Sequence, residues 1–496
     1  MLAEPKIELT AASLFGNDAA EDEDEGVFLG YVVERPELRA FLDPVNKICI
    51  ARAFKGEGKS ALLRLVQNRL GHDETSPLII AVTGKQISPV QAGKHTDVWV
   101  REWKRSILQH IARELGTRIG TAWSDDAISL VEEAEQAGFR SRNFISAVVD
   151  RLKSTAIPVS RERASVESAE KLVQRWAERT DGIWLFVDDV DENFKNEPSH
   201  KLKVASFFIA VREIVNAIPQ VRIRAAVRPN TWTTLALEYE ALSKVEQYNV
   251  NLRWTEPELR DVLGARVRGY LVRTNQWEDV ARGRTLSAED LIAFVFQSPV
   301  EWGRKTRPVH VPLVTLSRRR PRWLVELARE AAKAANSAHR RTISLPDITG
   351  CLEAFGKKRI ADTVAEFSPQ CPQIDELIAA FSRQAEEYST AELVVTLEKR
   401  VLQAITPSIV GVMGAPRPVD VAAFLFQIGF LSARRNLDGG EYEHLTYVDK
   451  PDLLRTRTNI DDGVRWEIHP VFRQALQMRD AAGRSLRVVP TDRRGR

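Results

Sequence analysis

Four short apolar runs, separated by much longer stretches, constrain the fold of this chain more than any other feature. The runs are residues 48–50, 78–82, 183–187 and 221–227, and each is short enough to be one buried strand. Longer segments with helical spacing, such as 97–115, lie between them. Parallel strands need crossover connections of this kind, whereas hairpins need only a few residues. The spacing therefore predicts an α/β fold with a mostly parallel sheet.

Both ends of the chain have the composition of tails. Residues 21–25 are five consecutive acids, which repel one another and bury nothing, so we expect residues 1–26 to form a flexible acidic tail. The last segment, 479–496, is basic and contains glycine and proline. We expect it to be a second flexible tail.

The body of the chain changes character near residue 250. Residues 27–250 contain the strand runs and are predicted to form the core, whereas residues 251–347 carry apolar side chains at helical spacing and are predicted to form a helical lid. Residues 348–478 continue as helices and end in two strands, near 442–448 and 463–468. Helices followed by a two-stranded ribbon are typical of a winged helix.

The composition excludes several classes of protein. Lys plus Arg number 71 and Asp plus Glu number 68, so any nucleic-acid contact has to be local. Cys49, Cys351 and Cys371 are too few and too scattered for a disulfide framework or a four-ligand zinc site, which favours a reducing compartment. No stretch approaches the roughly 18 apolar residues of a membrane span, and the N-terminus does not resemble a signal peptide. We expect a cytoplasmic protein with no membrane partner.

The stretch 53–60, AFKGEGKS, lies directly between an apolar run and a helical run. It matches the phosphate-binding P-loop G-x-x-x-x-G-K-[ST], except that Ala53 replaces the first glycine. Gly56 and Gly58 let successive N–H groups turn toward phosphate oxygens, and the positive end of the next helix faces the same anion. Lys59 would reach the β- and γ-phosphates, and the Ser60 hydroxyl would bind Mg²⁺. The predicted ATP-binding residues of this loop are Phe54, Lys55, Gly56, Glu57, Gly58, Lys59, Ser60 and Ala61.

Two carboxylates end the third apolar run, where a P-loop enzyme places its second conserved element. Asp188 would hold Mg²⁺ through water, and Asp189 would orient or deprotonate the attacking water. Glu192 is an alternative base, and the sequence does not choose between it and Asp189. An Asp is one methylene shorter than the Glu that many such enzymes use, which would displace the water-orienting oxygen and slow hydrolysis.

Three further polar residues are candidates for sensing the γ-phosphate. Asn230 or Arg228 follows the apolar run 221–227, although a capped loop after a core strand explains them equally well. Arg322 opens a helix in the predicted lid and would contact phosphates there. The alternative for the basic run 318–322 is a solvated face or a nucleic-acid contact.

Together these motifs resemble AAA+-type P-loop ATPases of the bacterial group that is related to origin-recognition initiators and to the signal-transducing NTPases with numerous domains (STAND). The likeness includes residues 35–38, the P-loop, 187–189, 228–229 and 320–322, and it extends less specifically to 466–472. It implies an ATP- and Mg²⁺-dependent switch or assembly platform that hydrolyses ATP slowly and forms a homo-oligomer. It also implies a role in bacterial antiphage defence. Because the sequence contains no nuclease, protease or deaminase motif, we expect any effector to be a separate protein.

Two other functions remain open at this point. The first is a DNA-loading or remodelling ATPase, in which the winged helix and the basic tail hold duplex DNA. Acidic neighbours nearly cancel the charge of the basic residues that would do so: Arg434, Arg435, Lys450, Arg455, Arg457 and Arg465. The second is a scaffold that keeps nucleotide bound permanently and is insensitive to replacement of Asp189.

Overall fold

The chain divides into two compact units. The sheet unit comprises residues 34–54 and 58–252, and the helical unit comprises residues 1–33, 55–57 and 253–496. Residues predicted to form a lid and a winged helix thus fall in one unit. The computed structural model describes residues 5–17, 20–71, 77–90, 93–118, 170, 173–174, 177, 182–303, 305–437, 442–447, 449–454 and 463–479.

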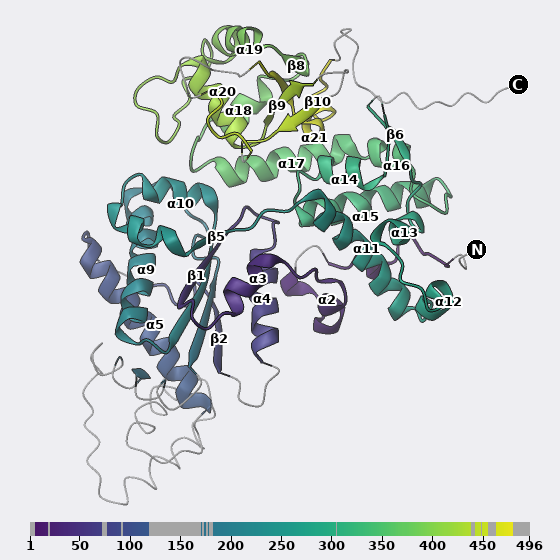
Figure 1. Cartoon of the computed structure of the whole chain (residues 1–496). Helices are drawn as coiled ribbons and strands as arrows, with labels where there is room; N and C mark the ends of the chain where they lie inside the picture. The colour runs from purple at the N-terminus through teal and green to yellow at the C-terminus, as the bar shows by residue number, and fades with distance from the viewer. Residues whose placement is uncertain are drawn as a thin grey trace, which may run out of the picture. The chain divides into compact units, whose positions relative to one another are not determined.

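The sheet unit is built on five parallel strands in the order β2-β3-β4-β1-β5 (Figure 1). The four predicted runs form β1 to β4, which confirms the α/β fold and the parallel sheet. Only the fifth strand was not predicted, because it is three residues long and polar at both ends. The strands are β1 (Ile48–Arg52), β2 (Leu78–Thr83), β3 (Ile183–Asp188), β4 (Val221–Val227) and β5 (Asn249–Asn251).

Helices cover both faces of this sheet. Helix α3 (Pro36–Leu42) packs on α4 (Lys59–Leu70), and α5 (Thr96–Arg118) packs on α9 (Pro198–Ala217), with the sheet between the two pairs (Figure 1). Helix α10 (Pro229–Ala236) follows β4 and packs on α9. The three central strands, β1, β3 and β4, carry nearly continuous buried side chains because both faces of the sheet are covered.

A row of aromatic rings joins these helices in the core. Trp103, Phe207, Phe208 and Trp232 follow one another edge to face, with ring centroids 5.1, 5.2 and 5.1 Å apart. Such pairs each contribute roughly 0.5–1.5 kcal/mol beyond the area that they bury. The row runs from α5 through α9 to α10, and it therefore ties the helix that follows β4 to the rest of the unit.

The N-terminal segment of the helical unit is folded where the charge run predicts a tail. Helices α1 (Ala12–Phe15) and α2 (Glu25–Tyr31) both pack on α11 (Glu256–Arg273). Phe15 is buried, and the guanidinium of Arg266 donates to its carbonyl and lies 3.9 Å from the centroid of the Tyr31 ring.

The acids of residues 21–25 have a local use that explains this difference. The Asp24 carboxylate caps α2 by accepting a hydrogen bond from the Val27 amide at 3.2 Å, and Glu25 lies in the first turn of the helix. Both positions favour negative charge because the N–H groups and the positive end of the dipole lie there. Glu23 accepts from the Tyr31 hydroxyl. In the described part of residues 1–26, the acids therefore support a helix and its contacts.

Helices form most of the segment predicted as a lid. Capping boxes at Thr255 and Ser287 begin α11 and α13 by pairing with Glu258 and Asp290. The sequence pattern missed a two-stranded hairpin, β6 (Val300–Trp302) and β7 (Lys305–Arg307), which is too short to show a clear alternation. The other helices are α12 (Trp277–Ala281), α13 (Ala288–Ala293), α14 (His310–Leu316), α15 (Pro321–Ser337) and α16 (Leu345–Gly350).

The C-terminal part contains a four-stranded antiparallel sheet in the order β10-β9-β11-β8. The two strands predicted as a ribbon, β10 (Tyr442–Leu445) and β11 (Arg465–Ile468), are not neighbours, because β9 (Leu431–Asn436) pairs with both. Strand β8 (Glu387–Tyr388) completes the sheet. The helices around it are α17 (Leu352–Phe367), α18 (Ile374–Ala379), α19 (Thr390–Thr396), α20 (Pro418–Gln427) and α21 (Pro470–Arg473).

Helix α17 approaches the α21 segment very closely at Gly356. A Cβ atom at this position would lie 2.5 Å from the Val471 carbonyl oxygen and 3.0 Å from the Ala475 Cβ. The glycine therefore lets α17 pack directly on the backbone that follows β11. Among the described residues, no helix combines the length and apolar character needed to cross a membrane.

We expect Gly356→Ala to destabilise the helical unit by about 1–3 kcal/mol, because the added methyl group overpacks this contact. Gly350→Ala is the matched control, since a Cβ there meets nothing within 4 Å and alanine favours the helix. Thermal unfolding of the two variants checks the prediction. An equal shift in both unfolding temperatures would contradict it.

Candidate functional site

The loop that follows β1 has the backbone that the P-loop motif predicts. Gly56 and Gly58 have φ values of 84° and 93°, a left-handed region in which a side chain would be strained. Ala53 is 1% exposed and its amide donates to the Val227 carbonyl at 3.3 Å, so it continues the pairing of β1 with β4. Alanine therefore fits at the position where the motif has its first glycine.

Lys59 and Ser60 begin α4 immediately after this turn. The N-cap of the helix is Gly58, which has no side chain to accept from the first amides, so these amides remain suited to an anion. Lys59 is 8% exposed, and its ammonium donates to the carbonyls of Ala53 and Phe54, at 2.9 and 3.5 Å. The lysine is thus held across the loop by backbone oxygens. Ser60 and Ala61 are half-buried on the first turn.

The carboxylates come from the strand two positions away. β4 pairs with both β1 and β3, and with neighbouring strands roughly 4.8 Å apart this leaves about 10 Å between the loop strand and the carboxylate strand. Asp188 ends β3, and its Oδ1 accepts from the Asp189 amide at 2.8 Å. Asp189 itself has a φ of 49°, which Asp tolerates better than most residues.

Gly84 makes room for the turn at Asp189. Its amide donates to the Asp188 carbonyl at 2.7 Å, and a Cβ atom on Gly84 would lie 2.6 Å from the Val190 Cα. The turn after β2 therefore holds the backbone of the carboxylate segment in place.

Opposing charges act on Asp189. Burial raises the pKa of its carboxyl, the Asp188 carboxylate raises it further, and the nearby cations of Lys59 and Arg228 oppose these effects. The net shift of the pKa is upward. The structure therefore brings Lys59, Asp188, Asp189 and Arg228 close enough for their charges to interact.

The cluster contains one residue that the sequence did not single out for a role. Asp191 is 1% exposed, and its Oδ2 accepts from the Arg228 amide at 3.1 Å. Its other oxygen, Oδ1, is buried without a hydrogen-bond partner among the described residues. A buried carboxylate oxygen of this kind is costly unless a cation or a donor reaches it. The sequence offered no signal beyond its closeness to Asp189.

Two other predicted residues have contrasting surroundings. Glu192, the alternative base, lies in the turn after Asp189 with an exposed side chain. Asn230 is buried in the first turn of α10, where its carbonyl accepts from the Thr234 hydroxyl. Asp189, in contrast to Glu192, is partly buried, and its charge interacts with that of Lys59.

The tip of the loop, Lys55–Glu57, belongs to the helical unit, and Arg322 lies against it there. The Arg322 amide donates to the Gly56 carbonyl at 3.2 Å, and a Cβ on Gly56 would lie 3.0 Å from the Arg322 Cβ. Close approach therefore adds to the positive φ as a reason for glycine at position 56. The Lys55 side chain is exposed, and Glu57 is half-buried.

Within the basic run 318–322, Arg319 is exposed, whereas Arg318 and Arg320 make contacts inside the unit. Arg318 donates to the Ile428 carbonyl at 2.6 Å, and its guanidinium lies over the rings of Trp323 and Phe472. Burial lowers its pKa to about 9. Arg320 is buried against Glu366 at 2.9 Å. The sequence could not reveal these roles, because the partners lie far along the chain.

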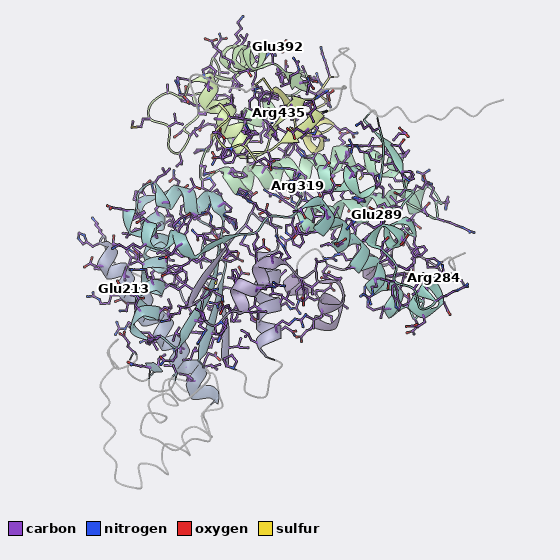
Figure 2. All side chains as sticks on the ribbon, viewed as in Figure 1. Glu213, Arg284, Glu289, Arg319, Glu392 and Arg435 are labelled. Carbon is purple, nitrogen blue, oxygen red and sulfur yellow. The ribbon has the colours of Figure 1, made fainter. Side chains whose placement is uncertain are left out.

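The arginines of the C-terminal sheet carry their own counter-ions. Arg434 pairs with Glu467 at 3.0 Å, Arg435 pairs with Glu443 at 3.2 Å, and Arg465 pairs with Glu387. Figure 2 labels Arg435 on β9 and Glu392 on α19 in this part of the chain. Of the other basic candidates, Lys450 is half-buried, whereas Arg455, Arg457 and the tail beyond Arg479 lie outside the described residues.

Burial of Glu467 would raise its pKa, but hydrogen bonding to His444 and the charge of Arg473 reverse this effect. The pKa of Glu467 falls to about 2 as a result. The carboxylate is therefore ionised at neutral pH and neutralises the cations around it. The cations of this sheet that the structure describes are consequently less available to phosphates.

No protein-family model matches the sequence, and no curated protein matches it. Among solved structures, Cdc6p from Pyrobaculum aerophilum is similar at 13% identity and a TM-score of 0.34, covering 94% of this chain and 96% of that chain. The Aeropyrum pernix ORC2 protein with ADPNP and ADP has 11% identity and a TM-score of 0.41, with 93% and 95% covered. Drosophila ORC bound to DNA has 11% identity and a TM-score of 0.31, with 91% of each chain covered. Likenesses this distant carry no conclusion about what this chain binds.

The raised pKa of Asp189 has a consequence for stability. A carboxyl with a raised folded-state pKa stabilises the protein below its unfolded pKa of about 3.9, and this stabilisation is lost as the pH rises through the folded pKa. We therefore expect Asp189→Asn to raise the unfolding temperature of the nucleotide-free protein at neutral pH. Asparagine also tolerates the positive φ.

The gain should disappear below about pH 4, where Asp189 is protonated in both states. Glu192→Gln serves as the control because that side chain is exposed, and it should shift the unfolding temperature at neither pH. A lower unfolding temperature for Asp189→Asn at neutral pH would contradict the prediction.

Proposed function

We propose that this protein binds ATP with Mg²⁺ and hydrolyses it slowly, and that it uses the nucleotide as a switch for assembly or partner binding. One observation carries the proposal. The parallel sheet gathers Lys59, on a glycine turn at a helix N-terminus, with the paired carboxylates Asp188 and Asp189 at one edge. A chance Gly-Lys turn would not be expected to lie beside two carboxylates from a distant strand.

The residues present suit the phosphates of a nucleotide. The left-handed glycines expose amides, α4 begins there without a capping side chain, and the Lys59 ammonium supplies a point charge. Phe54 to Ala61 would therefore bind the phosphates. Asn230 and Arg322 remain candidates for sensing the γ-phosphate.

Magnesium also fits the donor set. Hydroxyl and carboxylate oxygens are its preferred protein ligands, and Ser60 and Asp188 supply one of each. Oδ1 of Asp191, in the same segment as Asp188, is a further buried oxygen, and it has no hydrogen-bond partner among the described residues. When bound, the ion would neutralise developing charge on the phosphates.

Asp189 is the residue that we assign to the attacking water. In hydrolysis, an oxygen of water bonds to the γ-phosphorus as the bond to the β–γ bridging oxygen breaks, which yields ADP and phosphate. A base is most effective when its pKa lies near the working pH, and burial moves the pKa of Asp189 in that direction. The Asp189 carboxylate would orient the water and accept its proton.

We expect Lys59→Ala to weaken binding of Mg²⁺-ATP by roughly tenfold to a hundredfold, because it removes a charge-assisted contact to phosphate. Lys55→Ala is a matched control, since it removes an exposed lysine side chain from the same loop and keeps the backbone N–H through which position 55 would contribute. Calorimetric titration of both variants and the wild type measures the affinities. Equal affinity of Lys59→Ala and the wild type would refute the proposal.

Asp189→Asn should leave ATP binding intact and reduce turnover by about a hundredfold, the usual contribution of a general base. Phosphate release at saturating ATP measures this. If Glu192→Gln loses turnover instead, the role of base passes to Glu192. Turnover that neither variant changes would favour the permanent nucleotide-bound scaffold.

The winged-helix arginines do not favour DNA as the regulator, because Arg434, Arg435 and Arg465 are paired with carboxylates. We expect duplex DNA to change ATP turnover by less than about twofold. Its affinity for the protein should fall only gently as the salt concentration rises, with a slope that corresponds to fewer than about two phosphate contacts. A steep slope that is lost when the three arginines are replaced by alanine would restore the DNA-loading function.

Four finer expectations rest on the sequence and on the resemblance alone. These are a cytoplasmic location, a homo-oligomer, a role in antiphage defence and a separate effector protein. They extend the proposed switch without being needed by its chemistry.

A further inference from the structure

We propose that the buried ion pair of Glu366 and Arg320, on α17 and at the start of α15, positions the tip of the phosphate loop and thereby sets nucleotide affinity. The inference deepens the proposed function and rests on it. Glu366, Arg320, Arg322, Trp254 and the loop tip Lys55–Glu57 that they hold all belong to the helical unit. Glu366 and Arg320 are positioning residues in this proposal, because they act through the loop.

Three successive residues of the loop are held by their backbones. The Lys55 amide donates to Glu366 Oε1 at 3.0 Å, and the Lys55 carbonyl accepts from Arg320 Nη1 at 3.3 Å. The Gly56 carbonyl accepts from the Arg322 amide, and the Glu57 carbonyl accepts from the Trp254 indole N–H at 2.7 Å. All three carbonyls of the tip are therefore fixed by one unit of the chain.

The ion pair itself is well suited to this task. Glu366 and Arg320 are 5% and 3% exposed, and their charged atoms lie 2.9 Å apart. Burial would raise the pKa of Glu366, but Arg320 and the Lys55 amide lower it, so the carboxylate stays ionised. Because Arg320 neutralises it, the carboxylate adds no net repulsion toward a phosphate.

Holding the tip should favour nucleotide binding. Gly56 and Gly58 give the loop more conformational freedom than any other pair of residues would, and fixing that freedom opposes binding. Contacts that fix the loop beforehand remove this cost from the binding step. The N–H groups of the following residues can then donate to phosphate without a further change in loop conformation.

The pair also links the loop to the C-terminal sheet. Glu366 lies near the end of α17, whose Gly356 packs on the carbonyl of Val471 in the segment after β11. Any coupling of this kind is reciprocal. Nucleotide binding should therefore stabilise the docking of α17, and the docking of α17 should strengthen nucleotide binding.

The test replaces both charges at once, with Arg320→Met and Glu366→Met in the full-length chain. The double variant keeps the net charge and leaves no buried ion unpaired, and such swaps are often neutral for stability. Its dissociation constant for ADP should rise about tenfold, the scale of losing charge-assisted hydrogen bonds. The change should appear in KM rather than in kcat.

The matched control is the double variant Glu326→Met and Arg359→Met. This pair is also buried, at 2.8 Å, and Arg359 lies over the same Trp323 ring as Arg320. In the described part of the chain, the polar partners of this pair are Lys358 and Asp362, which do not belong to the loop. Its ADP affinity should equal that of the wild type.

Hydrogen exchange of the Lys55 amide without nucleotide gives an independent readout. Exchange of this amide should be faster in the Arg320/Glu366 variant and unchanged in the Glu326/Arg359 control. This expectation does not depend on the ability of the protein to bind nucleotide. If the first variant does not fold, Trp254→Phe keeps an aromatic ring, removes the donor to Glu57, and should weaken ADP binding about threefold.

The outcomes separate the two proposals. ADP binding that is lost in Lys59→Ala but unchanged in the Arg320/Glu366 variant overturns this inference alone, as does an equal loss in the Glu326/Arg359 control. A wild type that binds no nucleotide overturns the proposed function. In that case, an unchanged exchange rate of the Lys55 amide would also show that the pair does not hold the loop.

Discussion

The position of β4 between β1 and β3 is the constraint on which the candidate site depends. Parallel pairing brings the carboxyl ends of all three strands to one edge. The loop after β1 and the carboxylates after β3 therefore face the same side, separated by the width of one intervening strand. The spacing also leaves the end of β4 in the middle, where the Arg228 amide donates to Asp191. An antiparallel β4 would have sent its polar end to the opposite edge.

The electrostatics of this edge are unfavourable in the protein alone. Asp188, Asp189 and Asp191 share a small, partly buried region, and the cations of Lys59 and Arg228 only partly offset them. A cluster of like charges that lowers stability is expected where a site is organised for a ligand rather than for the fold. The helical unit shows the opposite arrangement. There Arg320, Arg359 and their carboxylate partners are buried and paired, and both guanidiniums lie over Trp323.

The elements that were predicted correctly carry their signal locally. The runs of β1 to β4 are apolar because both faces of the sheet are covered, and the P-loop is contiguous in the chain. The features that the sequence did not predict depend instead on partners that lie far along the chain. The acids of 21–25 cap a helix whose partner, α11, lies far along the chain, and β9 is recognised as a strand only through the pairing that it makes with β10 and β11. Asp191 and Glu192 are adjacent in sequence, and only the fold decides which of them is buried. Nothing in α17 distinguishes Glu366 from the exposed Glu353 on the same helix.

The hydrogen bonds described at the loop tip are made by the backbone of Lys55, Gly56 and Glu57. Residues at positions 55 and 57 are thus free to change identity in related chains without loss of these hydrogen bonds. Position 56 has no such freedom, because both its φ and its closeness to Arg322 require glycine. The consequence is an evolutionary one. Related chains should retain the glycine at position 56 together with a carboxylate on α17, whereas positions 55 and 57 should vary.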